Sequence, residues 1–109
     1  MTDVAVTVET SPDGSLVLRP HGELDAGAAV ELSQLVEHAV RHVRPLRLVF
    51  DLDDVDGLDP LSRGAFAAAC HLGDDHHVAV FVDNTSTTVA EQLAAAGVPL
   101  HRLRPVAAA

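Results

Sequence analysis

The chain of 109 residues has no lysine, tryptophan or tyrosine, and it has only three phenylalanines and one cysteine. Without tryptophan and tyrosine it offers few of the aromatic platforms on which single-stranded nucleic acids stack their bases. Its seven basic residues are all arginines and stand against 16 acidic residues, which gives a formal net charge of −9. A surface of this sign repels phosphate backbones and anionic membranes. We therefore expect neither nucleic acid nor a membrane surface among its partners.

Further absences limit the compartment and the chemistry. No apolar run approaches the roughly 20 residues of a membrane span, and Met1-Thr2-Asp3 lacks the positive and apolar regions of a signal peptide. These features predict a cytoplasmic protein. The single cysteine, Cys70, excludes an internal disulfide and lies on an apolar helix face, which predicts a buried, unreactive thiol. A Gly-rich phosphate loop and a Gly-x-Ser-x-Gly motif are both missing, so we expect no enzyme.

The apolar residues that are present follow a pattern of strands alternating with helices. Their order along the chain is β-β-α-β-α-β-α-β, and this alternation is typical of an α/β layer structure with right-handed crossovers. The length suits one domain with one core. The prediction is a single α/β domain over residues 1–109, with its core in about 4–105. Its mixed sheet begins with an N-terminal hairpin, and three to four helices pack against it.

Alternation of apolar and polar residues, or a continuous apolar run, identifies the strands. The hairpin covers residues 4–20 and turns at Ser11-Pro12-Asp13-Gly14. The remaining predicted strands are Leu46–Leu52, in a central parallel position, His77–Val82, and a short edge strand at Leu100–Leu103.

Helical spacing and end signals identify the helices. The first is Ala26–Val43, capped by Asp25 and stopped by Pro45. The second runs from Pro60 to about Leu72 and is ended by Gly73. The third begins among Thr85–Thr88, with Thr88 and Glu91 as a capping box and Gly97 as its C-terminal cap.

An acidic stretch follows the central strand. Carboxylates at Asp51, Asp53, Asp54, Asp56 and Asp59 allow a cation site of the kind that holds Mg²⁺. The interpretation we favour is a solvated loop in which Asp59 caps the helix that Pro60 begins.

Histidine clusters offer a second set of possible metal ligands. His38 and His42 are four residues apart on a helix, and His71, Asp74, Asp75, His76 and His77 lie around the turn after the second helix. Neither cluster has the further ligands of a recognisable metal motif. We interpret both as exposed polar residues and expect no metal and no cofactor.

Several segments together resemble the STAS family, the sulfate-transporter and anti-sigma-factor-antagonist domain. The resemblance covers about residues 4–105 and rests on four pieces in the family's order. They are Gly22-Glu23-Leu24-Asp25, the strand Leu46–Asp51, the turn Asp59–Phe66 with Gly64, and the spacing of Asn84, Val89, Leu93 and Gly97. Family members usually carry Asp-Ser-Ser-Gly at the turn, with the first Ser as phosphoacceptor. Here the matching residues are Asp59, Pro60, Leu61 and Ser62.

The resemblance implies a regulatory protein-binding module that acts as an anti-sigma factor antagonist. Its expected partner is an anti-sigma factor that is also a serine kinase. The implied partner-binding residues are Gly22, Glu23, Leu24, Asp25, Asp56, Asp59, Pro60, Leu61, Ser62 and Arg63. The alternative, from another class, is a soluble STAS subunit of an ABC-type lipid transport complex, which needs no phosphorylation.

The substitution at the phosphoacceptor turn alters what the resemblance implies about regulation. Pro60 has no hydroxyl, so phosphate cannot be placed at the usual position. Ser62, two residues on, is the candidate for a displaced acceptor; the alternative, which we favour, is that its hydroxyl bonds to backbone. We therefore expect either a constitutively active binder or one that permanently resembles the phosphorylated state, and the surrounding Asp residues favour the second.

Overall fold

The computed structural model describes residues 6–105, apart from the side chains of Asp56 and Pro105. A five-stranded sheet has the strand order β1-β2-β4-β6-β7. Strand β1 (Val6–Thr10) is antiparallel to β2 (Ser15–Pro20), whereas β2, β4 (Arg47–Asp51), β6 (Ala79–Thr85) and β7 (Leu103–Pro105) are parallel. The predicted mixed sheet with an N-terminal hairpin is confirmed, and β4 is central; Val4 of the hairpin lies outside the described residues.

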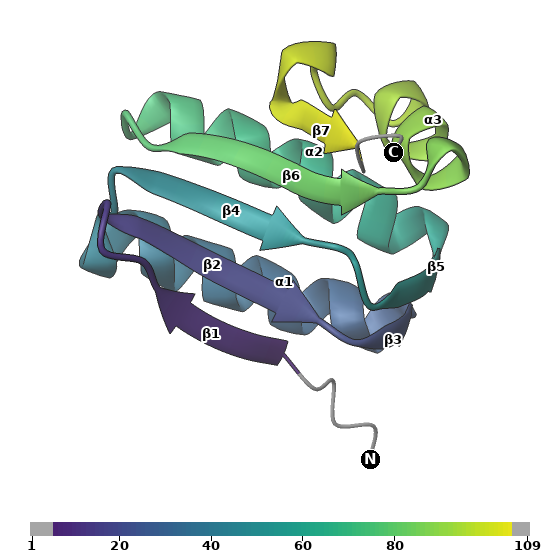
Figure 1. Cartoon of the computed structure of the whole chain (residues 1–109), viewed down its shortest axis with the longest axis horizontal. Coiled ribbons are helices and arrows are strands. Elements are labelled where there is room, and N and C mark those ends of the chain that lie inside the picture. The colour runs from purple at the N-terminus through teal and green to yellow at the C-terminus, as the bar shows by residue number, and fades with distance from the viewer. Residues whose placement is uncertain (1–5, 106–109) are drawn as a thin grey trace.

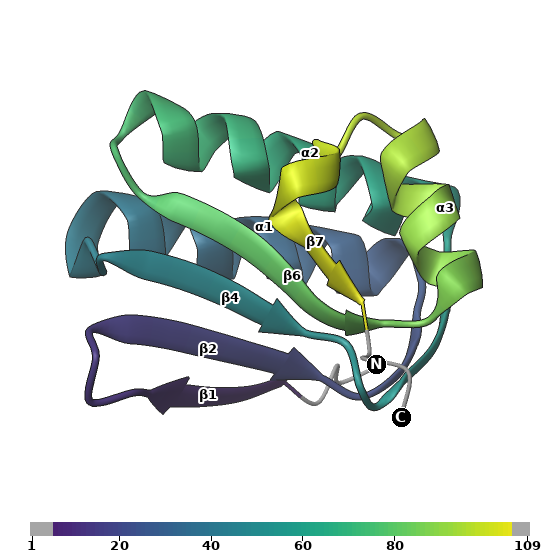
Figure 2. The ribbon, with the colours of Figure 1, turned by 45° about the horizontal axis from the view of Figure 1, so that its top comes forward.

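Helices α1 (Ala26–His38) and α2 (Pro60–Asp75) lie side by side over one face of this sheet, and α3 (Thr87–Ala95) lies near the carboxyl end of β6 (Figure 1, Figure 2). The core forms between the two layers. Its largest fully buried side chains include Leu18, Phe50 and Phe66. The rings of Phe50 and Phe66 meet edge to face at 4.9 Å between centroids, a favourable aromatic geometry.

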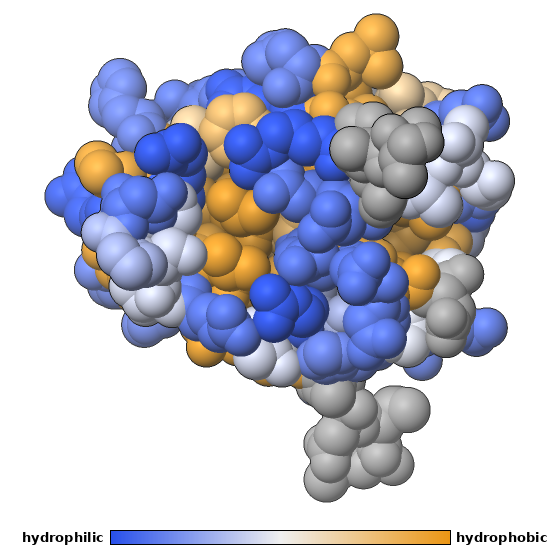
Figure 3. All heavy atoms as spheres, in the orientation of Figure 1, coloured by the Kyte–Doolittle hydropathy of each residue, from blue (hydrophilic) through white to orange (hydrophobic). Residues whose placement is uncertain are grey.

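The opposite face of the sheet, which faces the viewer in Figure 1, carries no helix among the described residues. Because side chains alternate along a strand, Val17, Val49 and Phe81 point to this face. Figure 3 shows apolar side chains near the middle of the face with polar and charged ones around them. Arg104 lies over the ring of Phe81 and pairs with Asp83.

Two short strands were not predicted. β3 (Gly22–Leu24) and β5 (Val55–Leu58) pair in parallel as a separate two-stranded sheet. The acidic stretch that contains β5 was predicted to be a loop, which was wrong, and no strand was predicted at Gly22–Leu24. Three or four residues are too few to show a period of two, and their partners lie far apart in the chain.

Several predicted boundaries of helices and strands need correction. The first helix does extend to Val43, but residues Ala39–Val43 form a π-helical turn, and Arg44 follows in the left-handed region at φ 53°. The cap of α3 is Ser86, whose hydroxyl accepts from the N–H of Val89, rather than the predicted Thr88. Gly97 has φ 108° and follows α3 as expected. The last predicted strand begins later, because residues Leu100–Arg102 form a 3₁₀ turn before β7.

Gly73 does not end α2, which continues to Asp75. A Cβ atom at Gly73 would lie 2.5 Å from the carbonyl oxygen of Val78 and 2.5 Å from a methyl group of Val80. The glycine is therefore needed for the close approach of α2 to the start of β6. A close contact of this kind leaves no local pattern in a sequence, and a glycine in a helix reads as a stop signal.

Candidate partner-binding site

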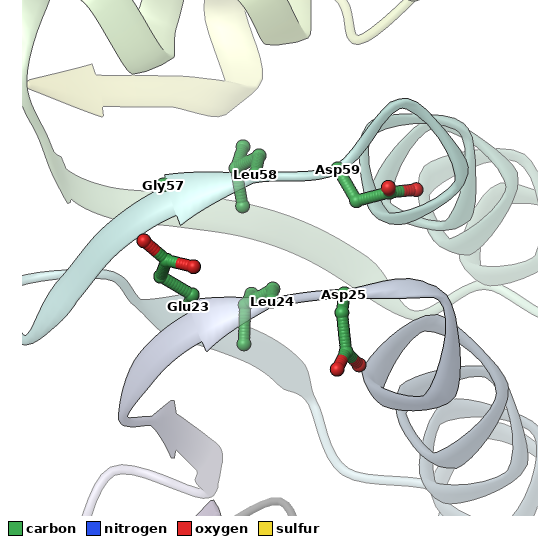
Figure 4. Close-up of a pocket in the computed structure, with 6 residues that line it drawn as sticks. All are labelled: Glu23, Leu24, Asp25, Gly57, Leu58 and Asp59. Atoms are coloured by element: carbon green, nitrogen blue, oxygen red, sulfur yellow. The ribbon is translucent and has the colours of Figure 1, made fainter.

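Strands β3 and β5 bring the two predicted docking segments together. Glu23 is in register with Gly57, and Leu24 with Leu58, so both strands end at the same edge (Figure 4). A helix starts directly after each strand. The predicted site is thus assembled from two strand ends and two helix amino termini that lie side by side.

Each helix is capped by an aspartate, as the sequence predicted. The carboxylate of Asp25 accepts from the N–H of Ala28 at 2.9 Å, and that of Asp59 accepts from the N–H of Leu61 at 2.9 Å. Both carboxylates lie at the positive end of a helix dipole, where a negative charge is stabilised. Pro60 occupies the first position of α2, where its missing N–H costs nothing, and it is exposed.

A shallow notch of about 300 Å³ lies between the two strand ends. Its lining residues are Glu23, Leu24, Asp25, Gly57, Leu58 and Asp59 (Figure 4). Three of these six residues are acidic, and none is basic. Among the described residues, no group of three or more His, Cys, Asp or Glu side chains is arranged to hold a metal ion. The notch therefore carries negative charge and offers no positive charge to offset it.

Ser62 lies inside the molecule and not on this surface. It is fully buried, and its hydroxyl lies 3.0 Å from the carbonyl oxygens of Leu24 and of Asp25. The hydroxyl does bond to backbone, although to a segment 37 and 38 residues earlier rather than to its own helix. Leu24 is also buried. A kinase cannot reach Ser62 in this conformation, and neither residue adds to the exposed docking surface.

The other predicted residues lie at or near the surface. Glu23, Asp25, Pro60 and Leu61 are exposed, Leu61 by 64%. Arg63 is half-buried because its guanidinium donates to the carbonyl oxygen of Leu58. Gly22 has φ 81°, and its N–H donates to the carbonyl oxygen of Asp54 at 2.9 Å. The side chain of Asp56 lies outside the described part of the structure.

The acidic loop is anchored by a residue that the sequence did not single out. Arg19, in β2, donates to the carboxylate of Asp51 at 3.1 Å. Burial by itself raises the pKa of Asp51, but hydrogen bonds from the Asn84 side chain, the Asp53 N–H and Arg19 outweigh it and hold the pKa below its ordinary value. Asn84 reaches this position from a left-handed conformation at φ 58°. No local signal could reveal the Arg19–Asp51 pair, since 32 residues separate the partners.

The remaining candidate residues add no chemistry to the site. Burial raises the pKa of the Cys70 thiol to about 11, so it stays protonated and unreactive, as predicted. His38 and His42 are exposed, with ring centroids 5.1 Å apart. The helices of the described part are all too short, or not apolar enough, to cross a membrane.

Comparison with known proteins gives one family. The sequence profile of the STAS domain matches residues 5–102. No curated protein sequence matches the chain.

Solved structures share the fold. SpoIIAA, the Bacillus cell fate determinant, in its phosphorylated form superimposes with a TM-score of 0.77 and 16% identity, over 94% of this chain and 92% of that one. A serine-to-glutamate variant of RsbS from Moorella thermoacetica also has a TM-score of 0.77 and 16% identity, over 95% of this chain and 87% of that one. An anti-sigma factor antagonist from Mycobacterium paratuberculosis is 27% identical, with a TM-score of 0.69 over 95% and 87%. The single α/β domain with a mixed sheet is thus the fold of these proteins.

Proposed function

Since the chain belongs to the STAS domain family, we propose that it is a non-enzymatic regulatory protein that binds an anti-sigma factor. The observation that supports this most is the pairing of β3 with β5, which brings Gly22–Leu24 and the start of α2, two segments that resemble the family's, to one edge. One similar protein, 27% identical, is an anti-sigma factor antagonist, and the chain covers 87% of it. A role of this kind belongs in the cytoplasm.

We further propose that this protein is not switched by phosphorylation at the family's turn. Pro60 has no hydroxyl, and Ser62 is buried with its hydroxyl bonded to two carbonyl oxygens. A phosphate would add about −1.5 to −2 charges at the docking face. Here Glu23, Asp25 and Asp59 already supply carboxylates beside the same helix start. The surface therefore carries negative charge permanently, with no kinase involved.

The first test is identification of the partner. The protein is immobilised at physiological salt and exposed to lysate of its source organism, and bound proteins are identified by mass spectrometry. We expect an anti-sigma factor of the serine-kinase type. Recovery of a transporter ATPase in its place would overturn the proposal and favour a soluble subunit of a transport complex.

The second test addresses phosphorylation with the recovered partner and ATP. Intact mass should show no added phosphate, and a stoichiometric phosphate on Ser62 would refute the proposal. The partner's affinity then separates two states. Weak binding that the double variant Glu23→Gln, Asp59→Asn strengthens would mean that these carboxylates hold the surface in a state that resembles phosphorylation. Tight binding of the unmodified protein would mean that it is always active.

A further inference from the structure

A groove runs between the outer faces of α1 and α2 and begins where the acidic notch ends. Its volume is about 550 Å³, and a second hollow of about 270 Å³ continues it towards Leu72. Ala26 and Pro60, the first residues of the two helices, line its beginning directly after the capping aspartates. On α1 the groove extends from Ala26 to Glu37, which is about three helical turns of about 3.6 residues each.

Small residues from both helices line the groove, and two large apolar side chains stand at its mouth. The small residues include Ala29 and Ser33 of α1 and Gly64 and Ala68 of α2. Val30 is 57% exposed and Leu61 is 64% exposed. Exposed apolar side chains that border a groove mark an interaction surface more often than scattered ones do.

Gly64 supplies an independent indication that another molecule approaches here. Its backbone is not left-handed, and a Cβ atom would meet nothing within 4 Å, so neither conformation nor internal packing requires glycine. In a helix interior, glycine costs about 1 kcal/mol relative to alanine. Gly73 of the same helix is different, because Val78 and Val80 leave no room for a side chain there. The open space over Gly64 would allow the backbone of a partner to come close.

The charges along the groove define the chemistry of that partner. Glu23, Asp25 and Asp59 line the notch, and no Arg, Lys or His of the described chain lines the notch or the two hollows. Glu37, the acidic residue of the groove itself, pairs with Arg41 at 3.3 Å. Arg63, the nearest basic residue on α2, turns its guanidinium to the carbonyl oxygen of Leu58. The acidic notch at the start of the groove attracts a basic segment and repels a second copy of this chain, whose net charge is −9.

We infer that the groove between α1 and α2 binds an amphipathic helix of a protein partner, with an apolar ridge over Gly64 and Ala68 and with arginine or lysine on its sides where it meets the acidic notch. Laying an apolar helix face into a groove is a recurring mode of recognition. The inference rests on the proposed function, because the amphipathic helix would belong to the anti-sigma factor and would bind next to Pro60 and Leu61.

The groove can be tested without the natural partner. Two synthetic peptides of about 18 residues, long enough for appreciable helix formation, carry the same alanine and leucine ridge. One has lysine flanks and the other glutamate flanks. Binding is measured by fluorescence anisotropy, and the site is mapped by amide chemical shifts. We expect the lysine peptide to bind at least about tenfold more tightly, with shifts confined to α1 and α2.

Two variants fill the groove without touching the core, Gly64→Leu and Ala68→Leu. Each should weaken the lysine peptide by about tenfold or more, while thermal melting shows that the fold is kept. The matched control is Ala95→Leu, which adds the same side chain at an exposed position of α3 and should leave binding unchanged. Equal binding of both peptides, absence of binding, or no effect of either groove variant would overturn the inference.

The same variants separate this inference from the proposed function. If the wild type binds an anti-sigma factor and Gly64→Leu binds it equally well, the groove is not used although the proposed function holds. If the wild type binds no anti-sigma factor but the lysine peptide still occupies the groove, the proposed function fails and the groove remains. A dimer in light scattering that Gly64→Leu dissolves would assign the groove to a second copy and overturn the inference.

Discussion

The molecule contains two units of the same design that lie next to each other, and their differences explain the site. The first consists of β2, β3 and α1, and the second of β4, β5 and α2. In each, a long strand of the main sheet leads to a short strand, a capping aspartate and a helix. The long strands pair in register, Leu18 with Phe50, and so do the short strands, Leu24 with Leu58.

The third residue after each capping aspartate differs in chemistry but not in depth. In the first unit it is Ala28 and in the second it is Ser62, and both are fully buried. The alanine fills space only. The Ser62 hydroxyl reaches across to the end of β3, so the second unit is fastened to the first. In the turn that resembles the family's phosphorylation site, Ser62 instead links the start of α2 to the residues that precede α1.

The largest predicted effect comes from placing a charge at Ser62. Ser62→Glu would bury a carboxylate beside the carbonyl oxygens of Leu24 and Asp25, and a buried charge without a partner costs about 3–5 kcal/mol. We expect most of the stability to be lost in urea denaturation. Ser62→Ala should cost only about 1 kcal/mol, because Asp59 and Ala29 still donate to the two carbonyls. Equal effects of the two substitutions would show that Ser62 is accessible in solution.

The next prediction compares the paired core residues of the two long strands. Phe50→Ala should cost about 3–5 kcal/mol and Leu18→Ala about 2–5 kcal/mol. Phe50 is expected to exceed Leu18, since it also loses the edge-to-face contact with Phe66, worth about 0.5–1.5 kcal/mol. Chemical denaturation of both variants measures the difference. A cost under about 0.5 kcal/mol at Phe50 would contradict its burial in the core.

Removing the two caps tests whether proline makes the second helix start less dependent on its aspartate. Each of Asp25→Ala and Asp59→Ala removes a hydrogen bond to a free N–H, at a cost of about 0.5–2 kcal/mol. Asp59→Ala should cost less, because Pro60 remains with a backbone already suited to the first helical position. Thermal melts at low ionic strength give the order. A larger loss for Asp59→Ala would show that the proline does not compensate.

The smallest effect concerns the ion pair that connects the long strands, Arg19 with Asp51. The pKa of Asp51 is lower in the folded protein than in the unfolded chain, so its contribution to stability is present above the unfolded pKa of about 3.9 and is lost as the pH falls through the folded pKa. Asp51→Asn should therefore flatten the acid side of the stability curve by less than about 1 kcal/mol. Urea melts between about pH 6 and pH 3 measure this. An unchanged slope would contradict the assigned shift.

Much of this arrangement follows from local patterns in the sequence. The hairpin, the central strand, the first two helices and their aspartate caps have apolar periods or end signals within a few residues, and these were predicted. The alternation of strands and helices then fixed the α/β class. The resemblance indicated the family and the turn Asp59–Ser62 as the position of its phosphoacceptor.

The parts that were not predicted depend on contacts between distant segments. β3 and β5 are strands only because each has the other as a partner. From the sequence alone, Ser62 is expected on the surface of the first turn of a helix, and only its contact with the end of β3 shows that it is buried. From the sequence alone, Gly73 is expected to end the helix, and only its contact with Val78 and Val80 explains the glycine. In each case the contact that determines the structure is made by a residue outside the local segment, so local sequence propensity cannot predict it.

The dependence of β3 on β5 also has a kinetic consequence. The β1–β2 hairpin is closed by a short turn at Ser11-Pro12-Asp13-Gly14, and such local pairs form within microseconds. The pairing of β2 with β4, and of β3 with β5, must wait for the whole of α1 to cross over. Loop closure over that length precedes any gain from the contacts. On a ribosome, β3 would therefore have no strand to pair with until β5 emerged, and the whole edge that the two strands build would form in a single step.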